Sequence, residues 1–405
     1  MSYLGPLMIL VCGFYPLSTL ASPPTIQNPT EPPKVETWHL QELWRLDNEE
    51  DEELPLMGVI NQAVVTSDGH VLLLDSQMAQ VLEISPGGEF LGTLSRMGQG
   101  PGELERPNTM FLADDGKLGL VQVFPGKIVL VNRDNTPGGS ITAQGNNPMF
   151  FRVKESAGNL VISGQTMEIR GGQGESINHR FIRQYTREGE GRNTYLEASV
   201  VSSHDPPVSN EEGTWFPNQA WAMAADGSML MASDRDAYRI EWVEPDGEIR
   251  RVITRDLEAH VRTEEERQEV LDSMRMWGPQ GEIIPKKTIL DTEPVIDQIQ
   301  VLDDGRIWVK SCYAKRNLPE GVHCRYDVFD KEGRLEAEVH IAFPVNRETD
   351  YFSMLNDGRF IWYRNGRSAL DAVYANMEAR DKTEEEDEID DEDMVVQVVL
   401  LERGE

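Results

Sequence analysis

Between residues 59 and 401 the chain alternates short apolar runs with polar, turn-forming residues. The runs Met110–Ala113, Leu118–Val123 and Lys127–Asn132 show the pattern, with Gly, Pro, Asp or Asn close to each end. Short β-rich runs separated by such residues predict strands and tight turns rather than helices. The pattern therefore predicts an all-β protein.

A unit of four predicted strands recurs along the chain. In each unit an apolar strand leads into a tight turn, and a second strand, a loop, a third strand, a second turn and a fourth strand follow. The first turns are Asp68-Gly69, Asp115-Gly116, Gly158-Asn159, Asp226-Gly227, Asp304-Gly305 and Asp357-Gly358. Four-stranded repeats of about 40 to 50 residues are typical of propeller blades. These turns predict a six-bladed β-propeller with four-stranded antiparallel blades.

One unit also contains a recognisable sequence motif. The stretch Gly98–Asp134 reads GQGPGELERPNTMFLADDGKLGLVQVFPGKIVLVNRD. Its GxGPGE turn, the Pro that follows and the later DDGKL resemble the blades of NHL-type six-bladed β-propellers, particularly a bacterial exported family. The resemblance covers most of residues 59 to 403. It implies a fold, and much less a function.

The two ends of the chain are predicted to close the ring together. Thr37–Leu46 alternates like a strand but has no neighbouring run with which to form a hairpin. Near the other end, Met394–Leu401 is an apolar strand that follows an acidic loop, residues 381–393. We expect the N-terminal strand to complete the sixth blade beside Met394–Leu401, because a closed ring leaves no unpaired edge. Residues 37–405 are accordingly assigned to the propeller.

One helical insertion, residues 255–292, interrupts the repeat between blades 4 and 5. Thr263 and Glu266 have the spacing of a capping box at a helix start. The apolar residues on one face of that helix are Val270, Leu271 and Met274. We expect the helix to pack over one face of the propeller, and a similar insertion is common in the exported family that the chain resembles.

The N-terminus predicts export. Leu7–Leu20 is largely apolar and ends in Thr19-Leu20-Ala21, a small-x-small cleavage pattern, so residues 1–21 are interpreted as a signal peptide. The Pro-rich residues 22–36 are predicted to be a linker. A periplasmic, cell-envelope or extracellular protein with no membrane span after cleavage follows from this interpretation, and an uncleaved anchor is the alternative.

The net charge of the chain narrows the classes of partner that the protein can bind. Asp and Glu number 70 against 38 Lys and Arg, which gives a formal net charge of −32. A protein with this charge repels phosphate backbones, so we expect no nucleic-acid partner. Runs such as residues 384–393, in which nine of ten residues are acidic, are predicted to be solvated loops. We expect a monomer.

Two cysteines remain after signal cleavage, Cys312 and Cys324. Folding the segment between them as a hairpin places them opposite each other, which predicts a disulfide in an oxidising compartment. Two reduced core thiols are the alternative.

Catalytic motifs are absent from the sequence: it contains no G-x-S-x-G elbow, no H-E-x-x-H and no EF-hand loop. The seven histidines are scattered, so we expect no metal site, no catalytic residue and no cofactor. Asp75 and Asp234 each end a predicted second strand, and we interpret each side chain as capping its own turn rather than as a ligand.

Loops between consecutive blades, and between second and third strands, converge on one face of a propeller and often bind ligands there. The predicted ligand-binding residues on these loops are Arg106, Asn108, Asn218, Arg235, Asp297, Arg316 and Arg367, with Asn147, Trp215, Gln298 and Lys315 nearby in sequence. Cations gathered on one face of an acidic protein would suit a carboxylate, a phosphate or an acidic peptide. An ordinary solvated rim is the alternative.

These features favour an exported, non-catalytic binding or scaffold module that recognises a protein segment or a small polar, anionic ligand at the channel mouth. The alternative is a metal-dependent enzyme of the lyase or lactonase kind, which would need carboxylates or imidazoles converging on the central axis.

Overall fold

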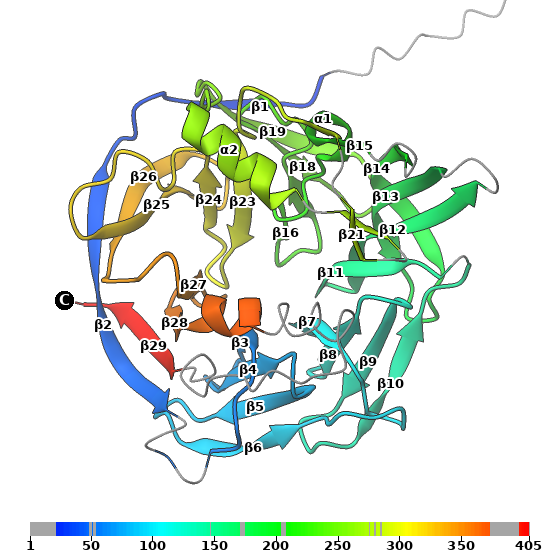
Figure 1. The fold of residues 1–405 in the computed structure, drawn as a ribbon. Coiled ribbons are helices and arrows are strands. Elements are labelled where there is room, and N and C mark those ends of the chain that lie inside the picture. Colours follow the sequence, from blue (N-terminus) through cyan, green and yellow to red (C-terminus); the bar gives the residue numbers. More distant parts are fainter. Residues whose placement is uncertain are drawn as a thin grey trace, which may run out of the picture.

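The computed structural model describes residues 22–47, 51, 54–145, 147–170, 175–203, 208–274, 276–278, 281–283, 286–372 and 397–404. The predicted signal peptide (residues 1–21) and the acidic loop (residues 381–393) lie outside the described residues. The described chain is all-β, with antiparallel sheets arranged around a central axis (Figure 1). This arrangement is a β-propeller.

Four propeller sheets stand separately in the described structure. The first contains β3 (Ile60–Val65), β4 (Val71–Asp75), β5 (Gln80–Ile84) and β6 (Phe90–Leu94). The second contains β7 (Pro107–Leu112), β8 (Leu118–Gln122), β9 (Lys127–Val131) and β10 (Pro137–Thr142). The third contains β11 (Met149–Ser156), β12 (Asn159–Arg170), β13 (Glu175–Tyr185) and β14 (Gly191–Ser203). The fourth contains β16 (Trp221–Met223), β17 (Met229–Met231), β18 (Arg239–Val243), β19 (Ile249–Arg255) and, at its outer edge, β1 (Thr25–Asn28).

The remaining strands form one sheet of eight. Its first half is β23 (Ile296–Val301), β24 (Ile307–Ser311), β25 (Val322–Phe329) and β26 (Leu335–Ala342). Its second half is β2 (Val35–Asp47), β29 (Gln397–Arg403), β28 (Phe360–Arg364) and β27 (Tyr351–Met354). The sequence predicts six separate sheets, and the structure differs because β2 is long enough to pair twice. Val35–His39 pairs in parallel with β26, and Leu40–Asp47 pairs antiparallel with β29.

The pairing of β2 with β29 joins the two ends of the chain in one sheet, as the alternation of Thr37–Leu46 predicts. The segment before it differs from the prediction. Thr25–Asn28, inside the predicted linker, is strand β1 and pairs in parallel with β19. The side chain of Asn28 is buried, donates to the Gly333 carbonyl at 3.1 Å and accepts from the Leu335 amide at 2.8 Å. This amide bridge between two sheets holds the segment in place despite its prolines.

Local signals placed the tight turns correctly. Gly69 and Gly116 adopt φ values of +86° and +80°, a region that side chains with a Cβ rarely enter. In the third unit the turn is Ala157–Gly158, one residue earlier than predicted, and Asn159 begins β12. Asp75 caps its own turn as predicted, because its carboxylate accepts from the amides of Gln77 at 3.1 Å and Met78 at 3.0 Å.

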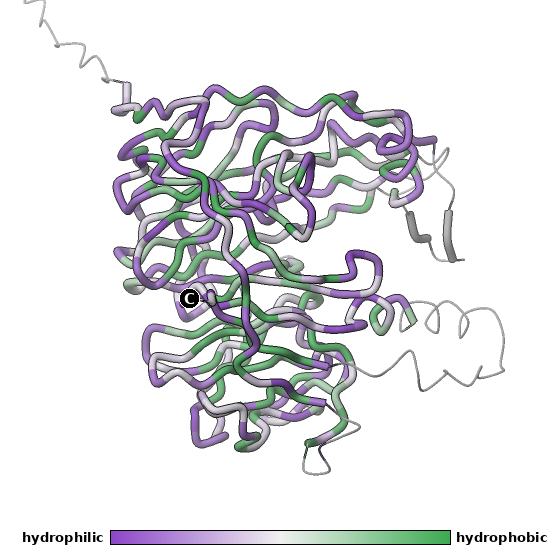
Figure 2. Tube along the Cα trace, turned by 90° about the vertical axis from the view of Figure 1, so that its left-hand side faces the viewer, coloured by the Kyte–Doolittle hydropathy of each residue, from purple (hydrophilic) through white to green (hydrophobic). Residues whose placement is uncertain are grey.

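The hydrophobic core lies between the sheets. Figure 2 shows hydrophobic stretches within the sheets alternating with hydrophilic turns. Clusters of buried apolar side chains fill each space between neighbouring sheets around the ring, and one lies between the two halves of the eight-stranded sheet. A sheet this small cannot bury both of its faces alone, so each depends on its neighbours for removing apolar surface from water.

Polar side chains on the inner part of the ring tie neighbouring sheets together. Each donates a hydrogen bond from its side chain to a backbone carbonyl of the next sheet or half-sheet. The contacts are Gln62 to Met110 (2.9 Å), Arg152 to Trp221 (2.8 Å), Gln300 to Met354 (3.0 Å) and Asn356 to Val65 (3.0 Å). These bonds fix the positions of β3, β7, β11, β16, β23 and β27, the strands nearest the axis (Figure 1).

The insertion between the fourth sheet and the eight-stranded sheet contains helix α2 (Glu264–Ser273). The predicted capping box is present: the Glu266 amide donates to Thr263 Oγ1 at 3.2 Å, and the Thr263 amide donates to Glu266 Oε2 at 2.8 Å. Val270, Leu271 and Met274 are half-buried rather than buried. The insertion also includes β20 (Met276–Gly278), β21 (Gly281–Ile283) and β22 (Lys286–Thr288), and β22 pairs with β15 (Val208–Asn210), which precedes helix α1 (Glu211–Thr214).

Cys312 and Cys324 are buried free thiols in the structure. The predicted disulfide is therefore not formed in it, and the alternative of two reduced core thiols describes it. Cys324 belongs to the core cluster between the halves of the eight-stranded sheet, where it packs as a small apolar side chain.

Candidate functional site

Two of the predicted ligand-binding arginines, Arg235 and Arg316, have carboxylate partners. Arg235 is 8% exposed and donates to Glu211 Oε1 at 3.2 Å and to Thr292 Oγ1 at 3.1 Å. Arg316 pairs with Glu266 and with Glu293, both at 2.7 Å. The prediction treated both guanidinium groups as available to a ligand. They instead anchor the insertion to the loops of the propeller.

Two carboxylates in this network, those of Glu211 and Glu266, have lowered pKa values. Hydrogen bonds from His260 and the Thr263 amide, together with Arg316, lower the pKa of Glu266 to about 2. Glu211 accepts from Arg262 at 2.7 and 2.8 Å and from the Leu290 amide at 2.9 Å. The carboxylates therefore neutralise the arginines Arg235, Arg262 and Arg316, which leaves no uncompensated positive charge on these three side chains for an anionic ligand.

Three other predicted residues do not converge. Arg106, Asn108 and Asn218 are exposed. The backbone carbonyl of Asn108 accepts from the Asn61 side chain at 3.1 Å, which is a contact between neighbouring sheets rather than a binding surface.

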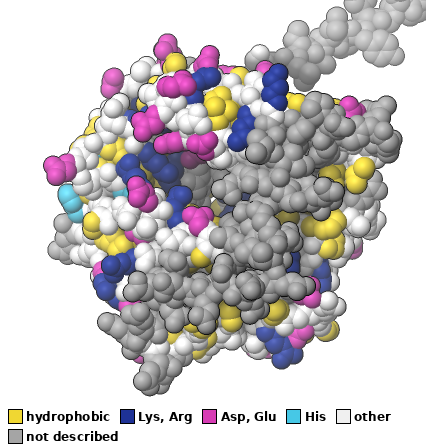
Figure 3. Space-filling view, in the orientation of Figure 1, with side chains coloured by type: hydrophobic (Ala, Val, Ile, Leu, Met, Phe, Trp, Pro, Cys, Tyr) yellow, Lys and Arg dark blue, Asp and Glu magenta, His cyan; other side chains and the backbone are white. Residues whose placement is uncertain are grey.

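The remaining predicted residues are Asp297 and Arg367. Arg367 belongs to a group of cations that the sequence prediction included only in part, and Asp297 lies near this group. We call Lys310, Lys315, Arg347 and Arg367 the cationic cluster. Lys310 lies in β24 and Lys315 in the loop after it, Arg347 lies between β26 and β27, and Arg367 follows β28. Strand ends and loops at one end of the two half-sheets bring the four together. On the face seen in Figure 1, Lys and Arg side chains gather beside a hollow (Figure 3).

His323, in β25, lies among these cations. Burial, together with the charges of Arg347, Lys310, Lys315 and Arg367, lowers its pKa to about 4. The Nδ1 atom of His323 is buried and has no hydrogen-bond partner among the described residues. The imidazole is therefore neutral near pH 7, and its buried Nδ1 lies without a partner among the described residues in a positively charged setting.

The four cations are positioned without carboxylate partners in the described part of the chain. Arg347 donates to the His323 carbonyl. Arg367 Nε donates to the Asp350 carbonyl at 3.1 Å, and its guanidinium lies 4.9 Å from the Tyr351 ring centroid. Asp297, exposed nearby, acts electrostatically on Lys310 and Lys315. The positive charge of the cluster is therefore largely uncompensated, in contrast to the network around Arg316.

Asp350 holds the loops that carry Arg347 and Arg367. Its carboxylate is buried and accepts from the Asn346 amide at 3.0 Å, the Asn365 amide at 3.0 Å and Trp362 Nε1 at 2.8 Å. One carboxylate thus orients the turn before β27 and the loop after β28.

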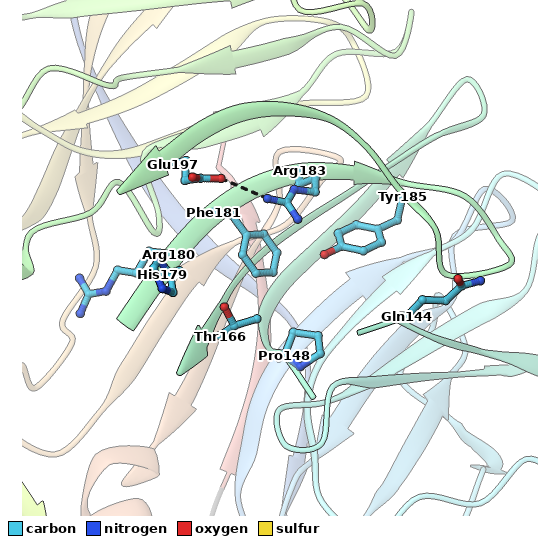
Figure 4. A pocket seen from close by; sticks show the side chains of 9 residues that line it. All are labelled: Gln144, Pro148, Thr166, His179, Arg180, Phe181, Arg183, Tyr185 and Glu197. Carbon is cyan, nitrogen blue, oxygen red and sulfur yellow. Dashed lines mark hydrogen bonds and ion pairs between the residues drawn. The ribbon is translucent and has the colours of Figure 1, made fainter. Parts of the chain in front are cut away.

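A separate cavity of about 160 Å³ lies against the third sheet (Figure 4). It is lined by Gln144, Pro148, Thr166, His179, Arg180, Phe181, Arg183, Tyr185 and Glu197. Arg183 pairs with Glu197 at 3.2 Å across it, and none of the predicted residues contributes. The cavity is polar; Glu197 neutralises Arg183, whereas Arg180 donates to the backbone carbonyl of Thr214.

No group of three His, Cys, Asp or Glu side chains in the described ranges is arranged to hold a metal ion. Within the same ranges, no helix has both the length and the apolar character needed to cross a bilayer.

Comparison with solved structures finds proteins of similar fold. An exported protein from Bacteroides fragilis matches with a TM-score of 0.52 and 11% identity, covering 94% of this chain and 100% of that one. Virginiamycin B lyase from Staphylococcus aureus matches with a TM-score of 0.39 and 12% identity, covering 80% of each chain. No protein-family profile and no curated protein matches the sequence. At these identities the likeness to the Bacteroides protein shows the fold alone, and the weaker likeness carries no argument.

Proposed function

We propose that the protein is an exported, non-catalytic β-propeller of the NHL-like kind that binds an anionic group, on a protein segment or a small polar molecule, at the cationic cluster. The observation that carries this proposal is the convergence of Lys310, Lys315, Arg347 and Arg367 without carboxylate partners among the described residues. Like charges that are held close together repel one another, and a bound anion would relieve that repulsion. Arg359, by contrast, pairs with Asp357.

We also propose that the ring has six blades. Each half of the eight-stranded sheet has four strands, an inner strand nearest the axis and a core cluster on either side. Counting the halves as blades gives six, with β2 bridging the fifth and sixth. Export to the periplasm, the cell envelope or the medium is supported by the sequence of residues 1–21.

Binding of a simple anion tests the proposal. Acetate and inorganic phosphate would be titrated into the protein, and NMR shifts of the His323 ring protons followed at low ionic strength, where surface charges are least screened. We expect saturable shifts that weaken as salt is added. The Arg347→Gln, Arg367→Gln double variant should lose about tenfold in affinity, since charge-assisted hydrogen bonds contribute about 1.4 kcal/mol or more.

A matched control variant removes the same number of positive charges from residues outside the cationic cluster. Arg192 and Lys331 are exposed. Arg192 lies in β14 of the third sheet, and Lys331 lies in the turn after β25, at the end of that strand opposite to His323. The Arg192→Gln, Lys331→Gln variant should bind like the unmodified protein. Equal affinity in the two double variants would contradict the proposed site, and a lack of any saturable shift would contradict anion binding altogether.

A further inference from the structure

The third sheet is longer than the second, and the cavity lined by Arg183 and Glu197 lies where their lengths differ. Strands β12, β13 and β14 contain 12, 11 and 13 residues, against five, five and six in β8, β9 and β10. The loop that follows β10 contributes Gln144 and Pro148 to the lining, and the rest comes from β12, β13 and β14. The cavity is therefore a ledge at the end of the shorter sheet, walled by the longer one.

A β-bulge in β14 positions the charged pair of this cavity. The register shifts between Ile182 and Arg183, which leaves Tyr195 as an extra residue in β14. In a regular strand two side chains three positions apart point to opposite faces. The extra residue brings Thr194 and Glu197 to one face, where Arg183 Nε donates to Thr194 Oγ1 at 2.8 Å and a terminal guanidinium nitrogen donates to Glu197 Oε2 at 3.2 Å. Bulges are over-represented beside functional sites, where they re-aim a side chain.

The charges within the cavity cancel. Arg183 is held by the contacts to Thr194 and Glu197, and its guanidinium also lies 5.0 Å from the centroid of the Phe181 ring. Arg180 borders the cavity, but its guanidinium donates to the Thr214 carbonyl and points away from the other side chains in Figure 4. One fixed cation and one fixed anion therefore face a ligand together.

Open, uncharged polar groups complete the lining. Gln144 is exposed and Thr166 is half-buried, and neither side chain has a hydrogen-bond partner among the described residues. The side chains of Glu197 and His179 are 56% and 39% exposed. The cavity thus presents an amide, a hydroxyl, a carboxylate and an imidazole, which offer donors and acceptors at the same place.

This mixture disfavours ions as ligands. An anion that approaches Arg183 also meets the negative charge of Glu197, and a cation that approaches Glu197 also meets Arg183. A neutral molecule with several hydroxyl groups avoids this conflict, because each hydroxyl both donates and accepts hydrogen bonds. The volume of about 160 Å³ lies below the range of about 300–1,000 Å³ that is typical for drug-sized ligands, so it suits one small ring.

We infer that this cavity binds a single neutral sugar ring, whose hydroxyl groups form hydrogen bonds with Arg183, Glu197 and Gln144. The site lies on the third sheet, apart from the cationic cluster, so the inference goes beyond the proposed function and does not depend on it. A sugar ring of this kind occurs as a free monosaccharide and as the terminal unit of a glycan.

Sugars that differ in charge test the inference on the full chain. Glucose, galactose and mannose would be titrated into the protein, and NMR shifts of the His179 ring protons followed. For each hexose that binds, the uronic acid and the protonated amino sugar with the same ring would be titrated as well. We expect saturable shifts with at least one neutral hexose, and binding of both charged forms that is weaker by about threefold or more.

Two results would overturn the inference. One is the absence of a saturable shift with any of the three hexoses, and the other is equal or tighter binding of either charged form. Neither result bears on the cationic cluster, because binding there is followed at His323.

A variant of Glu197 tests the selectivity. Glu197→Gln keeps an acceptor in place but leaves Arg183 without its counter-charge, so the uronic acid should gain about tenfold in affinity relative to the neutral hexose. Glu89→Gln removes an exposed acid at the turn before β6 in the first sheet, and as the matched control it should keep the preference for the neutral ring. An unchanged preference in Glu197→Gln would place the sugar elsewhere and overturn the assignment. Because the probes are first ranked on the unmodified protein, a poorly folding variant does not leave the inference untested.

Methyl glycosides separate the two sources of the sugar ring. The α and β methyl glycosides of the bound hexose carry a substituent where a glycan linkage would be. Binding of either glycoside as tightly as the free hexose would indicate the terminal unit of a glycan. Loss of binding for both would indicate a free monosaccharide.

Discussion

The carboxylate of Asp350 accepts a hydrogen bond from Trp362 Nε1 at 2.8 Å. Asp350 directly precedes β27, the innermost strand of its half-sheet, and Trp362 lies in the neighbouring strand β28. The same carboxylate accepts from the amides of Asn346 and Asn365. These bonds lock together the two loops that carry Arg347 and Arg367. The geometry of the cationic cluster therefore depends on a buried acid that is not itself exposed to a ligand.

Replacing this acid should loosen the site. In Asp350→Asn the amide nitrogen faces backbone N–H donors, so at least one donor loses its acceptor. We expect the free energy of unfolding to fall by about 1–3 kcal/mol and the affinity for acetate to fall several-fold. Denaturant unfolding and NMR titration measure the two effects. Asp304→Asn, at an exposed turn, is the control and should leave both nearly unchanged. Unaltered acetate affinity in Asp350→Asn would show that the two loops keep their positions without it.

The imidazole of His323 should titrate at an unusual pH. Its ordinary pKa is 6.5, and burial together with the surrounding cations lowers it to about 4 in the folded protein. Between these two values the unfolded chain holds a proton on this ring that the folded chain lacks. The contribution of His323 to stability is therefore complete above pH 6.5, is lost as the pH falls toward 4, and changes no further below that.

The size of the effect is about 1–2 kcal/mol once partial solvent screening is allowed for. An NMR titration of the His323 ring protons should give a midpoint near pH 4. In His323→Gln, the loss of stability between pH 6.5 and pH 4 should be smaller than in the unmodified protein. A midpoint near 6.5 would mean that the ring is neither buried nor close to the cations.

Arg316 should stabilise the helical insertion rather than bind a ligand. It pairs with Glu266 at the start of α2 and with Glu293 at the other end of the insertion, so Arg316→Ala leaves two acids facing each other. We expect faster amide hydrogen exchange in Glu264–Ser273, with exchange in the propeller strands unchanged. Acetate affinity at the cationic cluster should stay within about twofold of that of the unmodified protein, because the removed charge is already neutralised locally.

Arg334→Ala is the matched control, since this arginine is mostly exposed and pairs with Asp330 at a turn. It should leave exchange in α2 unchanged. A large loss of anion affinity in Arg316→Ala would restore the original interpretation of this residue as a ligand-binding cation.

Local signals in the sequence predicted the fold well. The Asp-Gly turns, the capping box of Thr263 and Glu266 and the strand at Thr37–Leu46 all depend on residues close in sequence or on a simple alternation. The merging of two half-sheets through β2 could not be predicted in this way. It depends on Val35–His39 pairing in parallel with β26, some three hundred residues away in the chain, which no short-range pattern encodes.

The residues of the proposed cationic cluster overlap only in part with the residues predicted from the sequence, for a similar reason. The rule that loops on one face bind ligands led to Arg367 and Asp297, and also to Arg235 and Arg316. Only the fold shows that Glu211, Glu266 and Glu293 neutralise the latter two. Lys310 and His323 were missed because they lie at strand ends and not in loops. A Lys that ends an apolar strand, as in IWVK, was the signal that could have identified the first.

Alkylation of Cys312 and Cys324 distinguishes a disulfide between them from two reduced thiols. Burial raises the pKa of Cys312 and of Cys324, and the thiolate is the form that reacts with alkylating reagents. In the native protein both should react with iodoacetamide much more slowly than a free cysteine, and both should react promptly in guanidinium chloride without a reducing agent. Mass spectrometry of peptides counts the modified residues. Unmodified cysteines in denaturant, recovered as one linked peptide, would show that the disulfide expected from the sequence forms after all. Fast labelling of the native protein would instead show that the strand ends around the cationic cluster open far more often than their packing implies.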